Sequence, residues 1–244
     1  MSLQFVLHPA PRDIVFIHGA GGTNLLWRRI LEGLEGEGRA FAVNLPGHPT
    51  GEISCRSIDE YVEAVRRFIS EAGIERPAIC GHSMGGAIAL TIAVKYPRDL
   101  SSLIVMDTGA KLGVLPSIRD GLLKNPLQTI ERVITPLSFY RADDELLRES
   151  RGTLAIPNLD VFLNDYAACD VFDIRERVSE LSARTLIMCG EYDKLTPPIW
   201  SHYLNARIPR STAFFIRDSG HMVPLEKPDA SGRLIIDFLA TPSR

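Results

Sequence analysis

The sequence predicts an α/β protein, with one mainly parallel twisted β-sheet, helices on both of its faces and an inserted helical cap. Short apolar segments that suit buried strands alternate with segments of helical periodicity over the first hundred residues, and this alternation resumes after residue 183. Such alternation is typical of βαβ units, whose crossover helices cover the sheet. Residues 109–183 instead contain helical segments and no convincing strand. We therefore expect a core of residues 1–108 and 184–244 and a helical cap of residues 109–183.

In the first half of the chain, the buried strands are expected at residues 13–18, 40–45, 77–82 and 101–107. Helical spacing of apolar residues predicts a helix between the first two strands, with Trp27, Ile30, Leu31 and Leu34 on one face. Ser57 and Glu60 form a capping-box pair that opens the next helix. Residues 84–95 are apolar nearly all round, as expected for a helix buried at the centre of such a sheet.

The second half begins with the helical segments of residues 109–183, which are separated near Pro116, Pro126, Pro136 and Pro157. Two further strands are expected at residues 185–189 and 212–216, and a closing helix follows Pro228. These last elements complete the sheet, so residues 109–183 are a helical excursion from it.

Composition narrows the class of protein and of partner. The chain has 244 residues, of which 45% are hydrophobic and 23% charged, as in ordinary globular proteins. Its net charge is −3 and no basic stripe is visible, so we expect neither nucleic acid nor a membrane as a partner. The N-terminus does not resemble a signal peptide, and the four cysteines have neither CxxC spacing nor the density of a disulfide framework. These features favour a cytoplasmic protein with Cys80 and Cys189 as buried thiols.

The most informative segment is Gly-His-Ser-Met-Gly-Gly at residues 81–86, between an expected strand and an expected helix. A serine in a Gly-x-Ser-x-Gly segment at such a joint sits on a sharp, strained turn that exposes its hydroxyl. The glycines are required because strand and helix approach too closely there for a Cβ atom. Ser83 is therefore a candidate nucleophile.

A serine hydroxyl needs a base to remove its proton, and the base works best when a carboxylate orients it. Asp193 lies in the loop after the strand at residues 185–189, and His221 lies between the last strand and the last helix. In an open α/β sheet, ligands bind at the carboxyl ends of the strands, so we expect these side chains to meet Ser83 there. The order Ser83, Asp193, His221 is the one expected for a nucleophile elbow on an α/β sheet.

At this point the sequence resembles the α/β-hydrolase superfamily over nearly its whole length. The resemblance is carried by the elbow, by the Asp193 and His221 loops, and by two further segments, His-Gly-Ala-Gly-Gly at residues 18–22 and Leu-Pro-Gly-His at residues 45–48. Within the superfamily the chain is similar to the smaller capped esterase-like and C–C-hydrolase-like members. We expect the usual N-terminal hairpin to be shortened or partly lost, because only about a dozen residues precede the first expected strand.

The resemblance implies a site with no cofactor and no metal. It implies that the backbone N–H groups of Ala20 and Met84 form the oxyanion hole, whose donors each lower the barrier by about 3 kcal/mol in enzymes of this kind. Asp107, at the end of a core strand, occupies a position where some members keep their acid, and it remains the alternative to Asp193. His18 is expected to shape the oxyanion loop, and His82 is expected to point to the other side of its strand and to pack or bind backbone.

The leading functional hypothesis is a serine hydrolase that cleaves small-molecule carboxylic esters with small to medium acyl groups. The same triad also suits cleavage of a carbon–carbon bond in a diketone, or a lyase-type elimination. A non-catalytic ligand receptor on the same fold is a third hypothesis, which the complete triad disfavours. Aromatic residues of the expected cap are candidates for an acyl pocket, namely Phe139, Tyr140, Phe162, Tyr166 and Phe172. The sequence makes no prediction of oligomeric state.

Overall fold

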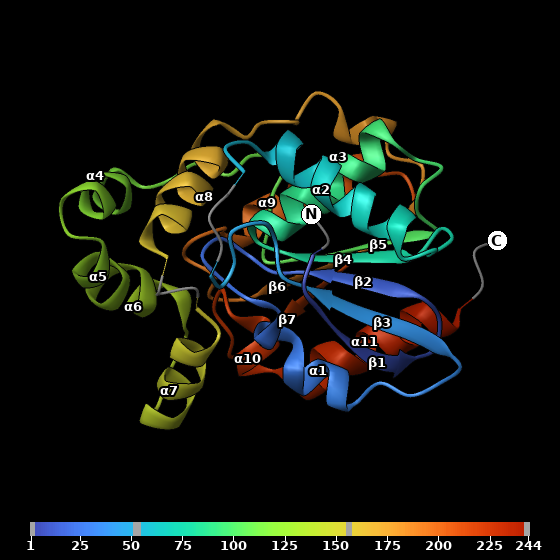
Figure 1. Cartoon of the computed structure of the whole chain (residues 1–244), viewed down its shortest axis with the longest axis horizontal. Coiled ribbons are helices and arrows are strands. Elements are labelled where there is room, and N and C mark those ends of the chain that lie inside the picture. The colour runs from blue at the N-terminus through green and yellow to red at the C-terminus, as the bar shows by residue number, and fades with distance from the viewer. Residues whose placement is uncertain (1–2, 51–54, 155–157, 242–244) are drawn as a thin grey trace.

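The computed structural model describes residues 3–50, 55–154 and 158–241, and within them seven strands form one sheet in the order β1-β3-β2-β4-β5-β6-β7 (Figure 1). β1 pairs antiparallel with β3, and every other pair of neighbours is parallel. The predicted mainly parallel sheet is therefore confirmed. The strands are β1 (Phe5–Ala10), β2 (Ile14–Ile17), β3 (Gly38–Val43), β4 (Ala78–His82), β5 (Ser102–Met106), β6 (Arg184–Gly190) and β7 (Ser211–Ile216).

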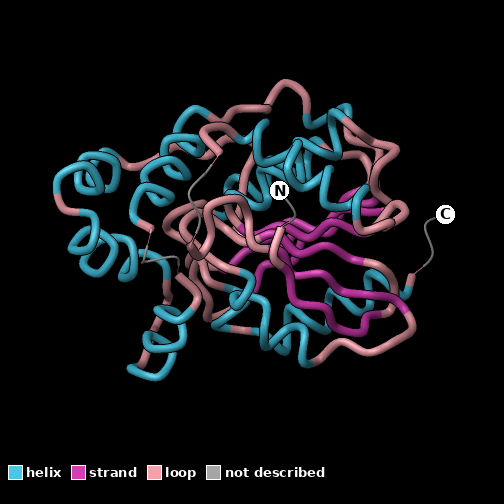
Figure 2. Tube along the Cα trace, viewed as in Figure 1, coloured by secondary structure: helices cyan, strands magenta, loops and turns pink. Residues whose placement is uncertain are grey.

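Helices cover both faces of the sheet (Figures 1 and 2). Alternate residues of a strand point to opposite faces, so β2 sends Val15 and Ile17 into one apolar cluster and Ile14 and Phe16 into the other. The first cluster contains residues of α2 (Ile58–Glu71), α3 (Met84–Lys95) and α9 (Pro198–Arg207). The second contains residues of α1 (Arg28–Glu32), α10 (Val223–Glu226) and α11 (Pro228–Ala240). Each face of the sheet therefore packs against its own layer of helices, and the two apolar clusters form the core.

The helix after Ser83 is the most deeply buried of these helices. Every residue of α3 from Met84 to Val94 is buried, which agrees with its uniformly apolar sequence. By contrast, α2 buries one face, and Ser57 accepts a hydrogen bond from Glu60 N–H at its start, as the capping pair predicts.

The segment between β5 and β6 is helical and lies to one side of the sheet, at the left of Figure 1. It contains α4 (Pro116–Lys124), α5 (Pro126–Thr129), a π-helical turn η2 (Ile130–Ile134), α6 (Thr135–Ser138), α7 (Asp144–Gly152) and α8 (Leu159–Val171). We call these elements the helical insertion. The expected break at Pro157 lies outside the described residues.

Two elements differ from the sequence-based expectation. β1 was not expected as a strand, because its residues Phe5 to Leu7 are 43–55% exposed and its partner β3 lies some thirty residues away. The expected helix around Trp27 is a 3₁₀ turn η1 (Asn24–Trp27) followed by the short α1, which ends at Gly33. A second short 3₁₀ turn, η3, spans Val178–Glu180. None of the helices in the described part of the chain combines the length and the apolarity needed to cross a membrane.

Candidate active site

Ser83 lies at the turn between β4 and α3 and has φ 53° and ψ −117°. This left-handed region is unfavourable for a residue with a side chain, so the backbone is strained there. The flanking glycines permit the turn: a Cβ on Gly81 would lie 2.1 Å from the carbonyl oxygen of Gly85, and one on Gly85 would lie 2.2 Å from that of Ile17. The steric reason inferred for these glycines is thus present in the structure.

The structure brings Ser83, His221 and Asp193 together at the carboxyl ends of the strands. His221 Nε2 lies 3.0 Å from Ser83 Oγ, and His221 Nδ1 lies 2.9 Å from Asp193 Oδ2. His221 is 5% exposed and Asp193 is 4% exposed, so their interaction is sheltered from water. This geometry allows a proton to pass from Ser83 to an imidazole whose other nitrogen is held by a carboxylate.

Further hydrogen bonds hold the carboxylate of Asp193. Its Oδ1 accepts from the backbone N–H of Leu195 and of Thr196, and its Oδ2 accepts from the Thr196 hydroxyl at 2.7 Å. Burial opposes ionisation of Asp193, but the nearby His221 and these hydrogen bonds outweigh it, and its pKa is lowered. Asp193 is therefore a charged partner for the imidazole at neutral pH.

The loop that carries His221 is tied to the helical insertion. His221 N–H donates to the carbonyl oxygen of Ser138 at 2.8 Å. Glu226 accepts from Gly220 N–H on one carboxylate oxygen and from Tyr140 N–H on the other. These bonds fix the backbone on which the imidazole is mounted.

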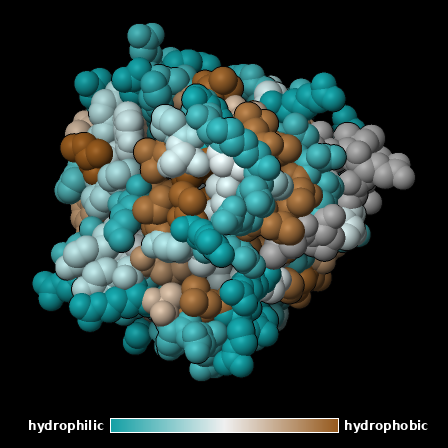
Figure 3. All heavy atoms as spheres, turned by 90° about the vertical axis from the view of Figure 1, so that its left-hand side faces the viewer, coloured by the Kyte–Doolittle hydropathy of each residue, from teal (hydrophilic) through white to brown (hydrophobic). Residues whose placement is uncertain are grey.

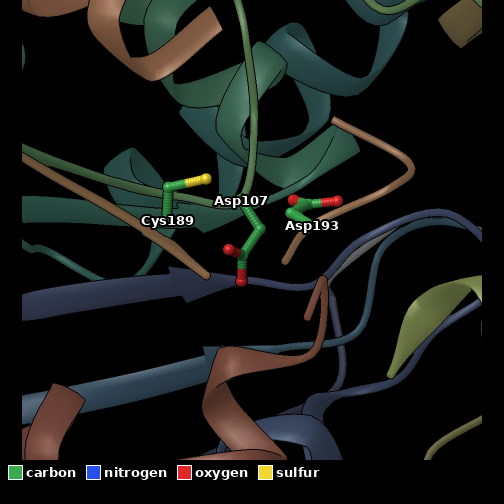
Figure 4. Close-up of side chains that lie close together, drawn as sticks. All are labelled: Asp107, Cys189 and Asp193. Atoms are coloured by element: carbon green, nitrogen blue, oxygen red, sulfur yellow. The ribbon is translucent and has the colours of Figure 1, made fainter. Parts of the chain in front are cut away.

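A second buried carboxylate lies beside Asp193 (Figure 4). Asp107 follows β5, and its oxygens accept from the backbone N–H groups of Gly190 and Val223. Burial, and then the proximity of Asp193, raise the pKa of Asp107 well above its usual range. No hydrogen bond between Asp107 and His221 is found among the described residues, whereas Asp193 makes one. The geometry therefore favours Asp193 as the partner of the imidazole.

Asp107, Cys189 and Asp193 also form a group that could be considered for a metal ion, since one ligand atom of each lies within 4.8 Å of the others. The carboxylate oxygens already accept hydrogen bonds from the protein, and burial raises the pKa of the Cys189 thiol, so the thiolate that a metal requires is disfavoured. We interpret the group as a hydrogen-bonded support for the Asp193 loop. The predicted burial of Cys80 and Cys189 is confirmed.

The loop after β2 approaches the elbow closely. A Cβ on Gly19 would lie 3.1 Å from Ser83 Cβ, so only glycine fits there without a shift, and its neighbour Ala20 is brought beside Ser83. Met84 is the first residue of α3, and the N–H groups of a first helical turn have no acceptor within the helix. The two N–H groups named for the oxyanion hole, Ala20 and Met84, thus come from segments that flank Ser83.

Two further histidines, His18 and His82, are buried near Ser83, His221 and Asp193. His18 Nδ1 donates to Gly19 O at 2.8 Å, and its Nε2 accepts from Leu45 N–H, so it braces the loop after β2 as expected. His82 donates to the backbone oxygen of His221, which agrees with the expected backbone bond. Its ring does not point away from the site, however, because its centroid lies 5.0 Å from that of His221.

A cavity leads from Ser83 and His221 into the helical insertion. Its walls are mainly apolar, and of the five aromatic candidates Phe139, Phe162 and Tyr166 contribute to it. Tyr140 instead stacks on Tyr192, and Phe172 packs in the core. The side of the molecule that carries the insertion shows hydrophobic surface surrounded by hydrophilic residues (Figure 3).

Sequence reasoning missed three groups near the site. Thr196 donates to Asp193 and lies 3.2 Å from His221 Nδ1, and its position three residues after an aspartate in a loop is the usual signal of such a bond. Asp165 is fully buried on α8, at a position where the helical periodicity calls for an apolar residue. His48, which binds Asp165, stands in the Leu-Pro-Gly-His segment from which no role was inferred.

The comparison with known families gives one match, to the model described as the alpha/beta hydrolase family, over residues 14–231. Among curated proteins, the chain is 29% identical to the 2-hydroxy-6-oxononadienedioate/2-hydroxy-6-oxononatrienedioate hydrolase 2 of Pseudomonas putida, over 93% of this chain and 87% of the relative. It is 28% identical to the pimeloyl-[acyl-carrier protein] methyl ester esterase of Aliivibrio salmonicida, over 90% and 89% of the two chains.

Among solved structures, the enol-lactonase of Burkholderia xenovorans LB400 superposes with a TM-score of 0.87 at 19% identity. The match covers 98% of this chain and 96% of that chain. At this identity the likeness shows a common fold alone.

Proposed function

From the premise that the chain belongs to the alpha/beta hydrolase family, we propose that it hydrolyses carboxylic esters through Ser83, His221 and Asp193. The observation that carries the proposal is the pair of distances around the imidazole, 3.0 Å to Ser83 Oγ and 2.9 Å to Asp193 Oδ2. In this proposal the helical insertion acts as the cap over the site, and no metal or cofactor takes part.

The proposed reaction proceeds in two halves. His221 Nε2 takes the proton from Ser83 Oγ, and the oxygen attacks the ester carbonyl carbon. The N–H groups of Ala20 and Met84 stabilise the negative charge on the carbonyl oxygen, after which the alcohol leaves with the proton from His221. Water then attacks the acyl-enzyme with His221 again as base, and the acid is released with Ser83 restored.

The lining of the cavity supports a substrate whose acyl group is uncharged. Of the described residues that line it, none is Arg, Lys, Asp or Glu. A carboxylate placed among apolar side chains without a cation would lose its hydration uncompensated. Uncharged polar side chains also line it, but most of the wall away from Ser83 is apolar and includes Leu26, Leu112, Val114, Ile118, Ile130, Ile134, Leu154 and Phe162.

A second candidate is hydrolysis of a carbon–carbon bond in a diketone, because one relative with that type of name matches nearly the whole chain. That relative is named for a dioate, a doubly charged acid, and the neutral lining of this cavity favours the ester over such a substrate. Neutral diketones remain compatible with the same wall and belong in the substrate panel.

Turnover of p-nitrophenyl butyrate by the purified protein tests the proposal. We expect hydrolysis that Ser83→Ala reduces by at least about 10³-fold. Ser70→Ala, an exposed serine on α2, is the matched control and should retain wild-type activity. Equal activity of Ser83→Ala and the wild type would overturn the proposal.

A further inference from the structure

A buried carboxylate of the helical insertion contacts the loop that carries Ala20. Asp165, on α8, is 0% exposed. Its Oδ2 accepts a hydrogen bond from Gly21 N–H at 2.7 Å, and its Oδ1 accepts one from the hydroxyl of Tyr61. Removing a carboxylate from water costs on the order of several kcal/mol unless donors replace the solvent. The core therefore supplies the donors that allow this charge to be buried.

His48 is the third donor to Asp165. Its Nε2 lies 2.9 Å from Asp165 Oδ2, and its Nδ1 lies 3.1 Å from the carbonyl oxygen of Pro46. A carbonyl oxygen only accepts, and the carboxylate already accepts from Gly21 and Tyr61, so both ring nitrogens face acceptors. Both side chains of the pair are fully buried. The buried carboxylate of Asp165 is thus held by partners from three other segments of the chain.

We propose that Asp165 is a positioning residue of the hydrolase, which fixes Gly21 N–H and thereby aims the neighbouring Ala20 N–H at the oxyanion on Ser83. The inference rests on the proposed function, because the direction of Ala20 N–H matters only if an oxyanion forms there. Gly21 has φ +62°, a conformation open to few residues. Gly22 N–H closes the turn by donating to Gly19 O, and the Asp165 carboxylate accepts the remaining N–H of Gly21.

The same contacts make the oxyanion hole depend on the position of α8. Phe162, one turn before Asp165, covers Gly21 so closely that a Cβ there would lie 2.3 Å from its ring. Gly21, His48 and Tyr61 come from the loop after β2, the loop after β3 and α2. If α8 moved away, Gly21 would lose its acceptor and Asp165 its donors. The loop and the helical insertion therefore adopt the productive arrangement together.

Asp165→Asn tests this role by kinetics. An amide oxygen is a weaker acceptor for Gly21 N–H than a carboxylate, so we expect kcat to fall by about 10–100-fold, as when an outer-shell partner of a metal ligand is lost, while KM changes less than about threefold. An alkyl trifluoromethyl ketone, which adds to the serine and places an oxyanion in the hole, should lose affinity by the same factor as kcat/KM. Asp160→Asn removes the same charge from an exposed position on α8 and should change neither quantity.

A result in which Asp165→Asn loses thermal stability but keeps kcat and ketone affinity within about twofold of the wild type would overturn the proposal, because a merely structural residue behaves in this way. Should Asp165→Asn fail to fold, Tyr61→Phe removes only the hydroxyl donor and should lower kcat and ketone affinity together by a smaller factor. Unchanged values for Tyr61→Phe would then count against the proposal.

Amide hydrogen exchange tests the contact on the folded protein without any activity measurement. We expect the backbone N–H of Gly21 to exchange more slowly in the wild type than in Asp165→Ala, because it donates to the buried carboxylate. Equal exchange rates would overturn the contact. An active wild type with an unaffected Asp165→Asn variant would reject this inference alone, whereas an inactive wild type with a protected Gly21 N–H would reject the proposed function and, with it, the positioning role.

Discussion

At the scale of single residues, the site contains two neighbouring buried carboxylates, Asp193 and Asp107, whose environments differ. Asp193 accepts four hydrogen bonds, including one from His221, and its pKa is lowered. Asp107 accepts two backbone hydrogen bonds, and burial together with Asp193 raises its pKa. Two neighbouring carboxylates with pKa values moved in opposite directions have different roles. In the proposed mechanism Asp193 orients the imidazole and Asp107 has a structural role.

Asp193→Asn should therefore lower kcat by on the order of 10⁴, because an amide stabilises the wrong tautomer of His221 and does not stabilise the imidazolium. Asp107→Asn should lower kcat by less than about tenfold, while the free energy of unfolding falls because its buried N–H partners are less well satisfied. Ester kinetics and urea unfolding of the two variants check this. A loss of kcat in Asp107→Asn that exceeds the loss in Asp193→Asn would show that Asp107, and not Asp193, orients the imidazole.

At the scale of elements, short connections bring distant segments to one edge of the sheet. The turn after β4 presents Ser83, the loop after β6 presents Asp193, and the loop after β7 presents His221. These placements follow from local rules, since the carboxyl ends of parallel strands meet at one edge. The helical insertion then provides most of the cavity wall, including the π-helical turn η2.

Ile134, in η2, tests whether that wall sets acyl-chain length. Ile134→Ala frees the space of about two methylene groups, each worth about 0.8 kcal/mol when buried, so the ratio of kcat/KM for hexanoate over butyrate esters should rise about tenfold. Leu123→Ala, 71% exposed in the neighbouring α4, is the control and should leave the ratio unchanged. An unchanged ratio in Ile134→Ala would show that this part of the insertion does not contact the acyl chain.

The same elements show how far sequence reasoning extends. The sheet core and α3 are continuous apolar segments, α2 and α11 have a clear apolar face, and the predicted bounds of these elements agree within one or two residues. β1 was missed because an exposed edge strand lacks a buried pattern and depends on pairing with β3. Ser83, Asp193 and His221 could be named because the elbow and the strand ends are local signals. The link between Asp165 and Gly21 joins positions 144 residues apart and depends on how α8 packs, which no local pattern encodes.

At the scale of the whole molecule, buried ionisable groups couple folding to pH. Burial lowers the pKa of His18 well below its usual range, and burial followed by the nearby His221 lowers that of His82 from 6.5 to about 3. Below about pH 6.5 the unfolded chain therefore binds protons that the folded protein excludes, so the stability contributed by these groups is complete above that pH and is lost as the pH falls. Asp107 contributes in the opposite direction. Its pKa is raised on folding, so its contribution to stability is lost as the pH rises.

We expect the free energy of unfolding to decrease between pH 7.5 and pH 5, with each neutral buried histidine contributing up to about 1.4 kcal/mol per pH unit. Urea unfolding at several pH values measures this slope. His82→Gln should reduce the slope by up to about 1.4 kcal/mol per pH unit, the contribution of one proton. His202→Gln, at an exposed position, should leave the slope unchanged. A slope that His82→Gln leaves unchanged would contradict the assignment of a neutral, buried His82.

The central claim is that Ser83 is a nucleophile activated by His221, and covalent labelling tests it most directly. After brief treatment with an alkyl fluorophosphonate, intact-mass and peptide mass spectrometry should find one phosphonyl group per chain, located on Ser83. Labelling should be absent in Ser83→Ala and slower by at least about 10³-fold in His221→Ala. Ester hydrolysis by a wild-type protein whose Ser83 stays unlabelled, or equally fast labelling of His221→Ala, would contradict the account.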